Sequence, residues 1–169
     1  MFKYLIIFVL LLLGTYSLAD IFDYPADTQT VVESLPQFNS ISCKFTQEKV
    51  FPQRTLQSGG NFHFIKEKGV IFETLYPVKT TTSYTSSGNK QINEIITSIA
   101  NKNYSVINKN FNLFYHNENG IWTVALQPKA KSPASQQLKN IIITGERNIN
   151  QININPLNGT NTKIKFYCD

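Results

Sequence analysis

The stretch that most constrains the fold is residues 58–77, SGGNFHFIKEKGVIFETLYP. Phe62 and Phe64 alternate with other side chains, so in a strand both rings point to one face. A Lys-Gly pair follows, which is typical of a tight turn because glycine readily takes the positive φ that such turns need. The apolar run after it stops at Pro77. The stretch therefore predicts a β-hairpin with one aromatic face.

The rest of the chain shows the same alternation in short segments. Asn119-Gly120 lies between two apolar runs, which is a strong signal for a second hairpin. Residues 127–137 are polar and contain two prolines, so we expect a loop there with room for one helical turn. Short connections between strands favour a meandering antiparallel sheet. Further strands are predicted at residues 41–50, 79–84, 111–116, 121–126, 138–144, 149–155 and 162–168.

Two segments have helical periodicity instead. Residues 27–35 can form a short helix that Asp27 or Thr28 caps and Pro36 ends. Residues 91–102 carry an apolar stripe that must cover an ordinary core or the mouth of a cavity. With helix confined to about two places, the predicted fold class is α+β, with the sheet dominant. The stripe consists of Ile92, Ile95, Ile96 and Ile99.

The strands contain more large apolar side chains than two short helices can cover. These side chains can line one side of a curved sheet. Such a face can be filled as a core, can be covered by a partner, or can hold an apolar ligand, and the sequence leaves all three open. The set comprises Phe45, Phe62, Phe64, Phe72, Phe111, Leu113, Trp122, Val124, Ile143, Ile154, Ile164 and Phe166.

The N-terminus has the features of a secretory signal peptide. Lys3 precedes an apolar run at residues 4–13, and Ser17-Leu18-Ala19 offers a small-x-small cleavage site. Cleavage after Ala19 would leave one exported domain, residues 20–169. An uncleaved N-terminal anchor is the alternative.

The chain has two cysteines, Cys43 and Cys168, each in a strand-like run. An even number in an exported chain favours a disulfide, and here it would tie the first long strand to the last. Two buried free thiols are the alternative. A metal site is not expected, because no histidine or further cysteine accompanies the pair.

The sequence contains no local signature of catalysis or of nucleic-acid binding. The net charge of +5 is spread over the chain, and only two arginines, Arg54 and Arg147, are present. His63 and His116 lie in strand-like runs, where a solvated surface role is the ordinary one. A hydrolase whose two acids lie far apart in the sequence remains open, since such a pair needs no motif. Because no local signature is present, we nevertheless expect a protein without catalytic residues or a cofactor.

The order of short motifs resembles the outer-membrane lipoprotein carrier (LolA-like) family. The resemblance runs from residue 27 to residue 166 and covers nearly the whole exported domain. It starts with Phe45-Thr46-Gln47 and Ser58-Gly59-Gly60-Asn61-Phe62, and continues with a lysine-rich turn and Tyr76-Pro77. It ends with Trp122-Thr123-Val124, Leu126-Gln127-Pro128-Lys129, Leu138-Lys139-Asn140-Ile141 and Thr162-Lys163-Ile164-Lys165-Phe166.

The resemblance implies a curved antiparallel sheet that forms an incomplete β-barrel, with short helices as a lid. It implies a monomeric periplasmic carrier that takes acylated lipoproteins, or another lipid, from an inner-membrane transporter to an outer-membrane acceptor. The acyl chains would lie between the apolar sheet face and the isoleucine helix. In the family an arginine is often found in the turn after the second long strand, where it helps to hold the lid closed, and Lys68 would take its place here.

Overall fold

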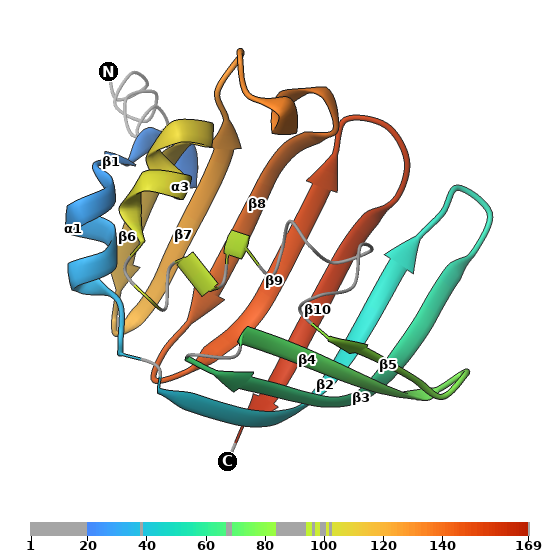
Figure 1. The fold of residues 1–169 in the computed structure, drawn as a ribbon. Helices are drawn as coiled ribbons and strands as arrows, with labels where there is room; N and C mark the ends of the chain where they lie inside the picture. Colours follow the sequence, from blue (N-terminus) through green and yellow to red (C-terminus); the bar gives the residue numbers. More distant parts are fainter. Residues whose placement is uncertain are drawn as a thin grey trace, which may run out of the picture.

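The computed structural model describes residues 20–37, 39–66, 69–83, 94–95, 97–98, 101 and 103–168. In this part of the chain, ten strands form one antiparallel sheet in the order β1-β6-β7-β8-β9-β10-β2-β3-β4-β5 (Figure 1). The sheet is open, with β1 and β5 at its two edges. The strands are β1 (Pro25–Ala26), β2 (Ser40–Val50), β3 (Thr55–Ile65), β4 (Gly69–Tyr76), β5 (Thr80–Ser83), β6 (Phe111–Glu118), β7 (Ile121–Pro128), β8 (Leu138–Gly145), β9 (Ile149–Pro156) and β10 (Asn161–Cys168).

The sheet consists of two meanders that meet at one seam. Strands β2–β5 follow one another along the chain, as do strands β6–β10, so each meander is built from sequential hairpins. The seam is the pairing of β10 with β2, from Asn161 opposite Val50 to Cys168 opposite Cys43. Figure 1 shows the sheet curving, with β4 and β5 running across the direction of β7 and β8.

A disulfide between Cys43 and Cys168 crosses the seam, as the even cysteine count favoured. The two residues face each other directly in the register of β2 and β10. Their Cα atoms are 4.4 Å apart, a spacing typical of the closer kind of antiparallel pair. The bond therefore joins the two meanders covalently near one end of the seam.

The N-terminal segment wraps around the edge of the sheet at β6. The 3₁₀ helix η1 (Ile21–Asp23) lies on one face, where Phe22 contacts Phe114 edge-on at 5.1 Å and Tyr24 stacks on His116 at 4.3 Å between ring centroids. Strand β1 then pairs with β6. The chain continues to the opposite face, which we call the inner face and define by Phe62, Trp122 and the other buried side chains that point the same way.

Two helices lie against the inner face beside β6. Helix α1 (Thr28–Ser34) buries Val31 and Val32, and its N-cap is Asp27. Helix α3 (Tyr104–Asn110) lies next to α1 in Figure 1, and the Thr28 hydroxyl donates a hydrogen bond to the Asn108 side chain between them. A short 3₁₀ helix, η3 (Pro133–Gln136), interrupts the connection from β7 to β8.

The coarse fold prediction is confirmed, because the protein is an α+β molecule dominated by an open antiparallel sheet. The first predicted helix and both hairpins are present, and the second hairpin turns at Asn119 and Gly120 with φ angles of 53° and 83°. Three strands are longer than predicted: β3 begins at Thr55, β6 extends to Glu118, and β7 extends to Pro128. Helix α3 was not predicted.

Some predictions concern residues outside the described part. The predicted signal peptide, residues 1–19, lies there, as do Lys68 and the isoleucines Ile92, Ile96 and Ile99. Within the predicted helix at 91–102, the described residues 94–95 and 97–98 are helical.

Candidate functional site

The apolar side chains predicted to line one side of the sheet do come together on the inner face. Eleven of the twelve residues expected to line this side are buried in one continuous hydrophobic cluster, and Ile154 is partly buried against it. Alternation places them there, since paired residues of neighbouring strands point to the same side. The buried eleven are Phe45, Phe62, Phe64, Phe72, Phe111, Leu113, Trp122, Val124, Ile143, Ile164 and Phe166.

Aromatic rings are concentrated where the two meanders meet. The Phe62 ring contacts Phe72 and Phe166, with centroids 5.1 and 4.7 Å apart. Phe45 meets Phe72 edge-on at 5.1 Å. These rings come from β2, β3, β4 and β10, so the aromatic group spans the seam. Tilted and edge-on contacts of this kind stabilise a cluster beyond the area that it buries.

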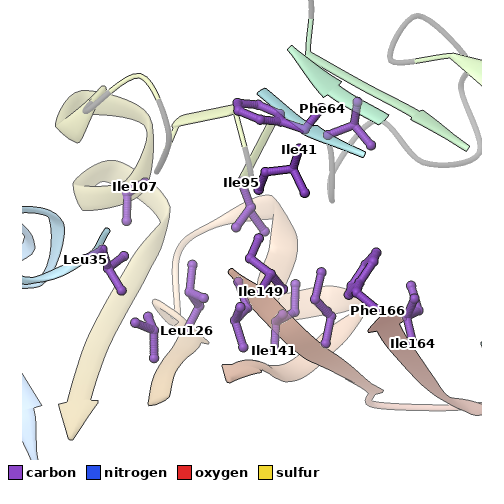
Figure 2. Close-up of a cluster of buried hydrophobic side chains, with 14 of the residues drawn as sticks. Leu35, Ile41, Phe64, Ile95, Ile107, Leu126, Ile141, Ile149, Ile164 and Phe166 are labelled. Atoms are coloured by element: carbon purple, nitrogen blue, oxygen red, sulfur yellow. The ribbon is translucent and has the colours of Figure 1, made fainter. Parts of the chain in front are cut away.

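Ile95 occupies the middle of this face. Its side chain is 3% exposed and belongs to the same cluster. Figure 2 shows Ile95 between Ile41 and Phe64 on one side and Ile149 on the other, so it bridges side chains from both meanders. Ile95, which is one of the described helical residues 94–95 and 97–98, thus lies where apolar side chains of the curved sheet flank it on two sides.

Helices α1 and α3 cover a different part of the face. Figure 2 places Leu35, at the end of α1, and Ile107, in α3, beside Leu126 and away from Phe166. The strands opposite the helices are therefore those of the second meander near β6 and β7. Sequence reasoning missed Ile107, because a segment of seven residues that contains three polar side chains in a row near its end is too short for a periodicity that distinguishes a helix from a loop.

Polar groups near the inner face are few among the described residues. Asn140 is buried and accepts a hydrogen bond from the Asn155 amide at 2.6 Å. The Trp122 indole donates to the Glu146 carbonyl oxygen at 2.7 Å. Both interactions satisfy buried groups within the fold, so they fix the sheet and its core and do not present a reactive group.

The two histidines that the sequence singled out are far apart on the sheet, and so is Glu73 from His116. His63 lies 3.0 Å from the Ser42 hydroxyl at the surface, and His116 lies 3.9 Å from Glu118 on strand β6. Glu73 accepts a hydrogen bond from Asn61 at 2.8 Å. In the described part of the chain, no group of three or more His, Cys, Asp or Glu side chains could hold a metal ion.

The fold and the site define a class of architecture: an open, curved antiparallel sheet whose inner face is apolar and partly covered by short helices. No model of a known protein family matches the chain, and no curated protein matches its sequence. Among the residues that the structure describes, no helix is both long enough and apolar enough to cross a membrane.

Proposed function

We propose that the protein is a non-enzymatic periplasmic carrier that binds acyl chains of lipoproteins, or of a related lipid, on its inner face. In this proposal the sheet is an incomplete barrel of the lipoprotein-carrier type, and the helical segment around Ile95 is a lid. Cargo would pass from an inner-membrane transporter to an outer-membrane acceptor. No cofactor takes part.

The observation that carries the proposal is the position of Ile95. It lies over an apolar surface that continues across both meanders, and it bridges them with one side chain. An acyl chain needs a surface of this kind, continuous and without charged groups, and gains about 0.8 kcal/mol for each buried CH₂. Displacing Ile95 would open part of that surface, whereas displacing a strand would break the sheet.

Native mass spectrometry of the protein, purified from exporting cells without detergent, tests the proposal. We expect phospholipid or a palmitoylated peptide to bind one to one. Ile95→Glu should abolish binding, because it places a carboxylate in the apolar cluster. Ile121→Glu is the matched control, since Ile121 is 46% exposed at the start of β7 and lies outside the cluster.

The mass spectrum of the wild type is the first test of the carrier proposal. If the wild type takes up neither phospholipid nor the palmitoylated peptide, the carrier proposal is wrong, whatever the variants do. Circular dichroism of Ile95→Glu shows whether the loss of binding comes from the site or from unfolding. Ile95→Ala, which keeps the surface apolar, should retain binding with lower affinity.

A further inference from the structure

Exposed apolar side chains are concentrated at one end of the sheet. Strand directions define a turn end, where β2 connects to β3, β4 to β5, β7 to β8 and β9 to β10. Among the exposed large apolar residues of the described part of the chain, two lie toward the opposite end, Ile121 at the start of β7 and Tyr167 near the end of β10. The other six lie at the turn end: Val50, Leu56, Leu75, Tyr76, Val78 and Leu157.

The β2–β3 hairpin and the β9–β10 hairpin form the centre of this end. Val50 is the last residue of β2 and pairs with Asn161, the first residue of β10, so the two turns are neighbours (Figure 1). Val50 is 53% exposed, Leu56 44% and Leu157 51%. Three exposed apolar side chains therefore lie in or directly beside two adjacent turns.

Hydrogen bonds hold both turns in place. The Phe51 amide donates to the Arg54 carbonyl at 2.8 Å, and the Arg54 guanidinium lies 5.7 Å from the centre of the Phe51 ring. The Leu157 amide donates to the Gln137 carbonyl at 2.9 Å, which ties the β9–β10 turn to the β7–β8 connection. The exposed side chains are thus presented by a fixed backbone.

The same end is strongly basic. Residues 47–58, 74–80, 127–139 and 154–163 make up its turns and strand ends, and Glu48 is the single acidic residue in these ranges. Glu48 already accepts a hydrogen bond from Gln57 at 3.5 Å. The cationic residues in these ranges are Lys49, Arg54, Lys79, Lys129, Lys131, Lys139 and Lys163.

We propose that the turn end docks on the surface of an anionic phospholipid bilayer. Apolar side chains at the tips of rigid hairpins can enter the headgroup region, while lysine and arginine stay at the level of the phosphates. A basic surface gains attraction from each cation near a negatively charged leaflet. A protein partner would need acidic groups and apolar pockets placed to match each of these residues, whereas a bilayer supplies both along its whole surface. The proposal does not depend on acyl-chain binding by the inner face.

Co-sedimentation with vesicles tests the docking. The protein is purified from exporting cells, and its intact mass shows whether residues 1–19 are removed. Vesicles contain phosphatidylcholine alone or phosphatidylcholine with one part in three of phosphatidylglycerol. We expect binding to the anionic vesicles only, and binding should weaken as NaCl is raised because salt screens exposed charges.

Two double variants test whether binding depends on the apolar side chains of the turn end or on exposed apolar side chains anywhere on the sheet. Val50→Ser with Leu56→Ser should lower the partition coefficient roughly tenfold, because two apolar side chains leave the interface. Ile121→Ser with Tyr167→Ser removes two side chains of similar exposure at the other end and should leave binding unchanged. Both are made in the same chain, so residues 1–19 contribute equally.

Three results would overturn the proposal. One is equal binding to neutral and anionic vesicles. Another is an equal loss of binding in the two double variants. The last is no binding by the wild type, which would leave the turn end as a contact surface for a protein.

Discussion

At the scale of single residues, Gly145 shows how tightly the inner face is packed at β8. A Cβ atom at this position would lie 2.2 Å from the Asn148 carbonyl oxygen and 2.3 Å from Cζ2 of Trp122. We expect Gly145→Ala to lower the free energy of unfolding by about 1–3 kcal/mol, because neither neighbour can move without breaking packing. Urea unfolding followed by tryptophan fluorescence measures the loss.

Gly120→Ala is the comparison for Gly145→Ala. Gly120 has a φ of 83°, and apart from its chain neighbours no atom lies within 4 Å of the place that a Cβ would take. Its replacement therefore costs only backbone strain, about 1 kcal/mol. The steric explanation for Gly145 fails if its alanine variant is no less stable than Gly120→Ala.

Residues also show what local sequence can and cannot predict. The Asn119-Gly120 dipeptide predicted its turn, because both residues tolerate the positive φ angles that a two-residue hairpin requires. Gly59 and Gly60 were expected in a strand, but the register shift between them was not. The shift leaves Leu75 of β4 between the partners of the two glycines, and atoms of Glu73 and Tyr76 lie where Cβ atoms at the two glycines would be. These close approaches exist only in the folded sheet, so the local sequence does not reveal the register shift.

At the scale of elements, helix α1 depends on its cap. The Thr30 hydroxyl donates to the Asp27 carboxylate at 2.6 Å and the Thr30 amide donates to it at 2.8 Å, and these bonds hold the pKa of Asp27 below its usual value of 3.8. Because the folded pKa is the lower one, the stabilisation is complete above pH 3.8 and is lost as the pH falls through the folded value.

We expect Asp27→Asn to remove this acid-dependent contribution and to keep most of the cap, since asparagine also accepts from backbone amides. Unfolding by urea at pH 7 and at pH 3 makes the comparison. The wild type should lose more stability between the two pH values than the variant does. An equal loss in both proteins would show that the Asp27 charge does not stabilise α1.

The strands could be predicted from the sequence, whereas helix α3 could not. The strands of the sheet were predicted because large apolar residues alternate along them, and the same alternation identified the lining of the inner face. Helix α3 was missed because tertiary contacts define it: Ile107 is buried in the cluster, and Asn108 accepts the hydrogen bond from Thr28 of α1. Neither contact leaves a periodic signal within residues 104–110.

At the scale of the whole molecule, the seam holds the two meanders together. Its disulfide joins residues 125 positions apart. We expect Cys43→Ala with Cys168→Ala to lower the free energy of unfolding by about 4–5 kcal/mol, because the unfolded chain regains the freedom that a closed loop of this length removes. Urea unfolding of the oxidised wild type and the double variant gives the difference.

The adjacent pair on the same two strands supplies the control. Lys44 and Tyr167 face each other one position along from the cysteines, on the exposed side of the sheet. Their double alanine variant removes a cross-strand pair without changing the loop, and we expect a loss of about 0.2–1 kcal/mol. A cysteine variant that is no less stable than this control would contradict the entropic role of the disulfide.

The order of strands across the seam also decides when the fold can be completed. Each meander can form from neighbouring residues as soon as its own segment is available, but β2 pairs with the last strand of the chain. Until residues 161–168 have been synthesised, β2 and β9 both present open edges, and contacts so distant in sequence form slowly. The C-terminal strand therefore acts as the final step of assembly, and a chain that stops before it would carry two exposed edges that can pair with other chains.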